Sequence, residues 1–397
     1  MSVTAAKGFR AVGLAAGIKC NGAKDLALVV NDAVAAVSAV AAVFTVNRFA
    51  AAPVLVSREA MALAEGGYSL PRAVLLNSGG ANACTGQDGY DDAKQAAGAL
   101  ARRLGLKTEE VLVGSTGLIG ERLPMGRLLA GTHQAVVNLG ATEAAGLAAA
   151  EAIMTTDTVP KTAVATGAAG GYTIGGMAKG AGMLAPALAT MLAVITTDAQ
   201  IDNPTAQQAL EQACRLSFER IDSDGCMSTN DTVILLASGA SGNQPEPQEF
   251  ADRLTAVAQD LARQLIADAE GAHHEVSVTV TGALTEDGAL KVARGIVRSN
   301  LFKTAVAGGD PNWGRILSAA GTVPPEDAPF EPNQVDVAIN GVTVCRHGGV
   351  GEPRHLVDLS GRQVDVVVNL NAGPSRATIW TNDLTHEYVS INADYPS

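Results

Sequence analysis

Short apolar runs of strand length alternate with helical patterns through the first half of the chain, and this alternation constrains the fold most strongly. Buried strands are predicted at 26–30, 43–46, 74–76, 111–113, 191–195 and 232–237. Helices are predicted at 90–104, 141–154, 206–220 and 250–270. Strands that alternate with helices predict sheets covered by helices, so we expect a mixed α/β fold built in layers.

The last part of the chain has a different pattern. Val276, Val278 and Val280 alternate with polar residues, which predicts a strand with one exposed face. A helix is predicted over 286–302, and Asn340-Gly341 is a hairpin turn signal between two further strands. Because 397 residues exceed what one hydrophobic core usually supports, we expect a main lobe over 1–282 and a smaller C-terminal α+β lobe over 283–397.

Charge and cysteine content limit the classes of partner. The net charge is −12 and no lysine or arginine cluster is present, which argues against a surface for nucleic acid or anionic membrane. Small molecules are therefore the expected partners. The five cysteines are far apart and have no metal or redox spacing, which indicates buried free thiols. No signal-type segment or membrane-spanning apolar run is found, so we expect a cytoplasmic protein.

The segment from Lys179 to Ala199, KGAGMLAPALATMLAVITTDA, is the strongest candidate for chemistry. Its glycines and proline permit irregular backbone before a short apolar strand, and Thr190 lies at the junction. If the Thr190 hydroxyl attacks the carbonyl of Ala189, an N-to-O acyl shift and hydrolysis leave Thr190 as a new amino terminus. A free α-amino group titrates at roughly 7.7 to 8.0, so it can act as the base for the threonine hydroxyl. Taken alone, the segment also fits a glycine-rich turn that leads into a core strand.

Further motifs favour the chemical interpretation, and with them the chain resembles the ornithine acetyltransferase family. These are self-cleaving glutamate N-acetyltransferases of arginine biosynthesis. The resemblance covers essentially the whole chain in order, through GFRAVGLAAGIK (8–19), AAVFTVN (41–47), LNSGGANACTG (76–86), STGLIGERLP (115–124), MTTDTVPK (154–161), KGAGMLAPALATML (179–192), STNDT (228–232), DPNWGRI (310–316) and the tail from Tyr388.

The resemblance implies an α-β-β-α-like sandwich similar to N-terminal-nucleophile hydrolases. It also implies cleavage into an α chain, 1–189, and a β chain, 190–397, with two copies of each in the assembly. The implied reaction passes an acetyl group from N-acetylornithine to glutamate through acetyl-Thr190 and needs no cofactor. Some family members also accept acetyl-CoA as donor, and some act in related pathways; this sequence leaves both questions open.

Two groups of site residues follow from the resemblance. Thr116 and Gly117 are implied to form the oxyanion hole, although a Ser-Thr-Gly turn after a strand is otherwise only a turn. The implied substrate-binding residues are Thr156, Lys179, Thr190, Glu270, Asn392 and Ser397. Lys179 could pair a substrate carboxylate and Glu270 an ammonium group; the alternative for each is a solvated surface charge. Asn392 and Ser397 would require the tail to fold into the pocket, whereas tails are normally frayed.

Other functions stay open at this point. An amidohydrolase or aminopeptidase would share the nucleophile but pass the acyl group to water. A binding protein would remain an uncut chain in which Thr190 is replaceable. The GxSxG and GxxxxGK[ST] motifs of serine hydrolases and nucleotide-binding loops are absent. The six histidines form no metal-ligand spacing, so we expect no metal.

Overall fold

The computed structural model describes residues 2–33, 37–167, 170–185 and 191–394. Ala189, Thr190 and Ser397 lie outside these ranges. The chain divides into two compact units. The first contains residues 1–219 and 226–265, and the second contains 220–225 and 266–396.

The first unit contains two sheets. The four-stranded sheet has the order β1-β2-β4-β5, with β1 Phe9–Leu14, β2 Leu26–Asn31, β4 Ala73–Ser78 and β5 Val111–Thr116. The five-stranded sheet has the order β3-β9-β8-β7-β6, with β3 Ala39–Phe44, β9 Thr232–Ala237, β8 Leu192–Thr197, β7 Thr173–Lys179 and β6 Lys161–Thr166. In each sheet one pair is parallel, β4 with β5 and β8 with β9.

Alternating side chains place the two sheets face to face. Ala27 and Val29 of β2 pack in one core with Val194 and Ile234 of the five-stranded sheet. Leu28, which lies between them in the sequence, packs in a different core with helical residues. This period of two is the expected arrangement of a strand with both faces buried.

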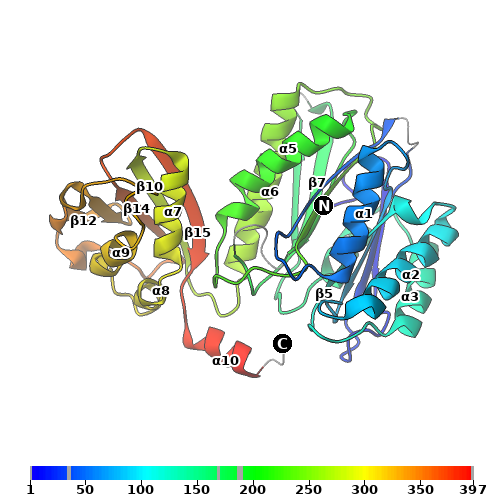
Figure 1. The fold of residues 1–397 in the computed structure, drawn as a ribbon, viewed down its shortest axis with the longest axis horizontal. Helices are drawn as coiled ribbons and strands as arrows, with labels where there is room; N and C mark the ends of the chain where they lie inside the picture. Colours follow the sequence, from blue (N-terminus) through cyan, green and yellow to red (C-terminus); the bar gives the residue numbers. More distant parts are fainter. Residues whose placement is uncertain (1, 34–36, 168–169, 186–190, 395–397) are drawn as a thin grey trace. The chain divides into compact units, whose positions relative to one another are not determined.

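Helices cover the outer faces, and Figure 1 shows them on either side of the paired sheets. Helices α2 (Gly86–Leu104) and α3 (Met125–Val137) pack in one core with the four-stranded sheet. Helix α6 (Pro247–Ala267) packs on β7. The two are so close that a Cβ added at Gly176 of β7 would lie 3.0 Å from the Leu261 side chain of α6. The remaining helices of this unit are α1 (Ala52–Glu65), α4 (Glu143–Ala152) and α5 (Asn203–Leu216). The predicted mixed α/β layered fold is confirmed.

The second unit is built on one six-stranded sheet with helices packed against it. The strand order is β13-β12-β11-β14-β10-β15, with β13 Gly349–Val350, β12 Val342–Arg346, β11 Asp336–Ile339, β14 Gln363–Asn369, β10 Glu275–Ala283 and β15 Ser375–Asn382. Its helices are α7 (Glu286–Val297), α8 (Asn300–Ala307), α9 (Trp313–Ala320) and α10 (His386–Asp394). Val276, Val278 and Val280 are buried in its core, as their alternation predicts.

The structure departs from the sequence-based expectations at a few places. The second unit starts at Ile266, before residue 283, because β10 pairs with both β14 and β15 and so belongs to that sheet. The predicted helix 286–302 is two helices, since Ser299 caps α8 by accepting a hydrogen bond from the Phe302 N–H. All five cysteines are free, but the expectation that all are buried is wrong: Cys20, Cys84 and Cys226 are exposed.

Candidate active site

The carboxyl end of β5 leads into a tight turn that contains Thr116 and Gly117. Thr116 is 2% exposed, and its carbonyl accepts a hydrogen bond of 3.0 Å from the Gly80 N–H. Gly117 has φ of +130°, and a Cβ at this position would lie 2.5 Å from the Gly80 nitrogen. Only glycine permits this close approach of two backbone segments.

Buried amides hold this turn. Ser115 Oγ donates to Asn77 Oδ1 at 2.6 Å, and Asn77 Nδ2 donates to the Gly80 carbonyl at 3.0 Å. Asn230 Nδ2 donates to the carbonyl of Ser115 at 2.8 Å. These buried groups satisfy one another's hydrogen bonds, which restricts the backbone around Thr116.

Lys179 ends β7 and lies beside the turn. Its side chain is among the largest that are fully buried, and its Nζ lies 3.2 Å from Thr116 Oγ1. Lysine is almost never fully buried unless it is paired, so the sequence-based alternative of a solvated surface charge is wrong. A buried ammonium group beside a hydroxyl is suited to binding an anion.

Asp157 lies in the segment that follows α4 and contacts Gly180, the residue after Lys179. Its Oδ1 accepts hydrogen bonds from Lys161 Nζ at 2.6 Å and from the Gly180 N–H at 2.7 Å. Burial raises its pKa, but the charges of Lys179 and Lys161, with the hydrogen bonds, outweigh burial and lower the pKa to about 2. Thr156, the neighbouring residue, is half buried.

A second buried carboxyl group belongs to Asp231, at the start of β9. Its Oδ1 accepts a hydrogen bond of 3.0 Å from the N–H of Met191, the residue that follows Thr190 in the chain. Its Oδ2 is buried and has no hydrogen-bond partner among the described residues. Burial raises the pKa of Asp231 well above its usual range, and the Met191 hydrogen bond and the Lys179 charge offset only part of this effect.

In the second unit the structure brings Glu270 and Asn392 together. Asn392 Nδ2, on α10, donates to Glu270 Oε2 at 2.9 Å. The sequence analysis implied a substrate-binding role for each residue but no contact between them, and their contact with substrate stays a prediction. The chain is helical as far as Asp394, in α10, whereas chain ends are normally frayed.

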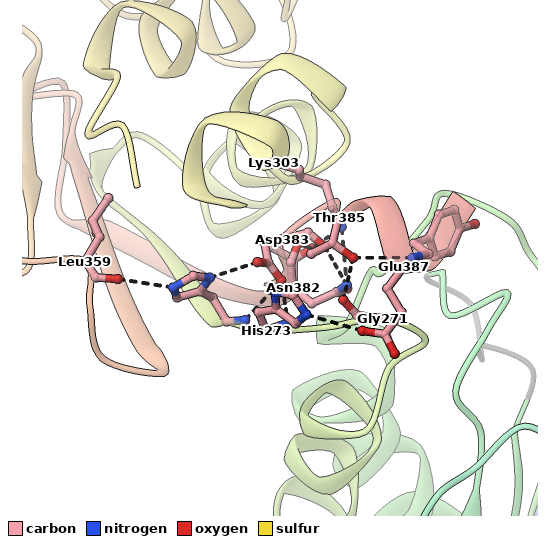
Figure 2. Close-up of polar contacts among 11 residues, drawn as sticks. Gly271, His273, Lys303, Leu359, Asn382, Asp383, Thr385 and Glu387 are labelled. Atoms are coloured by element: carbon pink, nitrogen blue, oxygen red, sulfur yellow. Dashed lines mark hydrogen bonds and ion pairs between the residues drawn. The ribbon is translucent and has the colours of Figure 1, made fainter. Parts of the chain in front are cut away.

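Figure 2 shows the contacts that anchor the start of α10 to the chain around Gly271 and His273. Thr385 Oγ1 donates to the Gly271 carbonyl at 2.7 Å and accepts from the Tyr388 N–H at 3.3 Å. Asp383, which is 1% exposed, accepts hydrogen bonds from the backbone N–H groups of His273 and His274. The start of the helix is thus tied to the chain that follows Glu270.

The described site residues fall into two sets. Thr116, Gly117, Thr156 and Lys179 belong to the first unit, and Glu270 and Asn392 to the second. Sequence reasoning assigned no role to Asn230, Asp231 or Lys161 and did not consider Asn77 or Asp157. One sequence signal could have identified two of them: Asp157 and Asp231 are the aspartates of the motifs MTTDT and STNDT, and each motif lies next to a predicted strand or helix.

Two negative findings concern the described part of the chain. In it, no group of three or more His, Cys, Asp or Glu side chains could hold a metal ion. No helix found there is long and apolar enough to cross a membrane.

Comparison with known proteins gives matches along the whole chain. A profile described as the ArgJ family matches residues 10–397. The arginine biosynthesis bifunctional protein ArgJ of Streptomyces avermitilis is 57% identical over 397 residues, covering 100% of both chains. The protein of the same name from Bifidobacterium longum is 54% identical over 399 residues, again with 100% of both covered.

A solved structure is also similar. A chain of the ornithine acetyltransferase of Mycobacterium tuberculosis complexed with ornithine is 50% identical, with a TM-score of 0.42. The match covers 47% of the present chain and 94% of that chain.

Together with a rigid, buried hydroxyl and lysine at two strand ends, the whole-chain sequence matches define an acyltransferase. The protein belongs to the ArgJ family.

Proposed function

We propose that the protein transfers an acetyl group from N-acetylornithine to glutamate by a ping-pong route. The chain first cleaves itself between Ala189 and Thr190. The Thr190 hydroxyl oxygen then attacks the acetyl carbonyl carbon of the donor, the amide C–N bond breaks, and ornithine leaves after its nitrogen takes up a proton. The amino group of glutamate next attacks the acetyl ester, the ester C–O bond breaks, and the threonine hydroxyl is restored.

The close pairing of buried Lys179 and Thr116 carries this proposal. Thr116 and Gly117 would stabilise the oxyanion, and Lys179 with Thr156 would hold the α-carboxylate that donor and acceptor share. The family resemblance also implies substrate contacts for Glu270, Asn392 and Ser397. Glu270 would take the terminal ammonium of ornithine. Proteins named for arginine biosynthesis are 54% and 57% identical to this chain over its whole length, which supports this choice of substrates.

Intact mass spectrometry before and after addition of N-acetylornithine, with no acceptor present, tests the proposal. We expect two fragments, the second starting at Thr190 and gaining one acetyl group. Cleavage without acetyl gain would favour an amidohydrolase or aminopeptidase, in which water removes the acyl group. Acetyl-CoA in place of N-acetylornithine tests the second donor in the same assay.

Replacement of the nucleophile gives a sharper test. Thr190→Ala removes the hydroxyl, so the chain should remain one species of 40.3 kDa and be inactive. Thr190→Ser keeps both a hydroxyl and an α-amino group and serves as the control, which should still cleave. A cleaved or active alanine variant would contradict the mechanism. We further propose that the protein is cytoplasmic. We also propose an assembly of two α and two β fragments, and native mass spectrometry of the cleaved protein would measure this stoichiometry.

A further inference from the structure

Asp157 and Lys161 form a fully buried ion pair in the first unit. Both side chains are 0% exposed, and their charged atoms are 2.6 Å apart. A buried pair contributes little net stability, because removing two charges from water is costly and apolar residues of similar volume often serve as well. The pair therefore calls for an explanation other than stability.

The contacts of Asp157 supply one. Its Oδ1 accepts from the Gly180 N–H at 2.7 Å, and its Oδ2 accepts from the Thr155 N–H at 2.9 Å. Thr156 lies directly after Thr155, and Lys179 lies directly before Gly180. One carboxylate therefore fixes the backbone on both segments that carry the proposed carboxylate-binding side chains.

Charge balance adds a second, independent argument. Lys161 and Lys179 are both buried, and Lys19 Nζ donates to the carbonyl of Met154 at 2.7 Å on the same segment. Asp157 compensates Lys161 directly through their contact. Without Asp157, the buried ammonium group of Lys161 would attract another anion or repel the ammonium group of Lys179.

We propose that Asp157 is a positioning residue for the substrate carboxylate. It holds Thr156 and Lys179 in register with each other, and its negative charge stabilises the buried ammonium groups of both Lys161 and Lys179. This inference rests on the proposed function, because it assumes that one α-carboxylate site serves both half-reactions.

Steady-state kinetics of Asp157→Asn test the inference. The amide removes the negative charge, and its nitrogen cannot accept a hydrogen bond from a backbone N–H. Because donor and acceptor use the same carboxylate site, KM should rise by a similar factor for N-acetylornithine and for glutamate. We expect about tenfold for each, the effect of losing one charge-assisted hydrogen bond. The turnover number kcat should fall by less than KM rises, because the nucleophile and the backbone of the Thr116 turn are unchanged and only the Lys179 contact with Thr116 Oγ1 is disturbed.

Two further variants separate positioning from stability. Asp157→Asn leaves Lys161 charged and buried, which can impair folding or cleavage. The double variant Asp157→Asn/Lys161→Met removes both charges and should fold and cleave, yet retain the raised KM. Asp92→Asn is the matched control, since Asp92 is also a buried aspartate paired with a cation, Arg122 at 2.9 Å. Its KM values should be unchanged.

The outcomes distinguish this inference from the proposed function. If the wild type gains no acetyl group from N-acetylornithine, the proposed function fails. If the wild type is active but either Asp157→Asn or the folded double variant has wild-type KM values, the inference is overturned and the pair is structural. A rise of KM for one substrate alone would also overturn it, because a shared carboxylate site requires both.

Discussion

At the scale of single residues, the first unit buries several charged or polar side chains and pairs each of them with a specific hydrogen-bond partner. Lys179, Asp157 and Asp231 are all buried, and each has a partner from a different part of the chain. The sequence motifs identify the segments that contain them. Their burial could not be predicted, because it depends on strands that meet only in the folded sheet, such as β7 ending beside β5.

Gly117 gives a prediction at this scale. In Gly117→Ala the new Cβ would meet backbone atoms of Gly79 and Gly80 at about 2.5 to 2.6 Å, and backbone cannot move aside as a flexible side chain can. The turn should shift and lose the geometry of the proposed oxyanion hole, so kcat should fall roughly a hundredfold, the usual effect of losing one oxyanion donor. Single-turnover acetylation followed by mass spectrometry measures it.

Gly120→Ala is the control for backbone strain. Gly120 has φ of +85°, but a Cβ there would meet nothing within 4 Å. This variant should cost about 1 kcal/mol of stability or more and leave the acetylation rate near that of wild type. Equal loss of rate in both variants would mean that left-handed backbone strain, and not contact with Gly80, explains the effect.

At the scale of elements, periodicity predicted the buried strands β2, β4, β5, β8 and β9 and the helices α2, α4, α5 and α6. The sequence analysis did not predict the strands β1, β6, β7, β14 and β15 or the helices α1, α3 and α9. It missed where β3 lies: a strand was expected at 43–46 and is found at Ala39–Phe44, because the alanine-rich run has no clear apolar alternation. It also merged α7 with α8, since the apolar spacing continues past the Ser299 cap. Helix α10 was not predicted, because its fixed position comes from tertiary contacts and not from propensity.

Those contacts make α10 sensitive to one hydroxyl group. Thr385→Val removes the hydrogen bonds to the Gly271 carbonyl and from the Tyr388 N–H, at a cost of about 1 kcal/mol each. Amide exchange over 386–394 should become faster, and KM for N-acetylornithine should rise a few fold as Asn392 loses its place beside Glu270. Hydrogen exchange with mass spectrometry and initial rates measure the two effects.

The comparison variant is Thr378→Val in the same unit. Its hydroxyl shares a hydrogen bond of 2.8 Å with Thr279 Oγ1 on the neighbouring strand of the sheet. Exchange over 386–394 should stay at the wild-type rate in this variant. If it increases equally in both, the helix depends on the stability of the whole unit and not on Thr385.

At the scale of the whole molecule, the order of strands in the five-stranded sheet matters most for the proposed cleavage. Strands β3, β6 and β7 precede Thr190 in the chain, whereas β8 and β9 follow it. The sheet order β3-β9-β8-β7-β6 places β8 and β9 between strands of the first fragment. This interleaving could not be read from the sequence, because which strands pair is decided by long-range contacts.

The two fragments should therefore stay together after cleavage. Strand β9 pairs with β3 over Thr232–Ala237, and β8 pairs with β7 over Leu192–Thr197, so backbone ladders join the fragments on both sides. Their side chains also share one buried core, which would be exposed on separation. With an affinity tag on the first fragment only, the second should remain bound through native washing and elute only in denaturant. Release of the second fragment in native buffer would contradict this topology. The uncut Thr190→Ala chain is the control, and it should release no second fragment in native buffer or in denaturant.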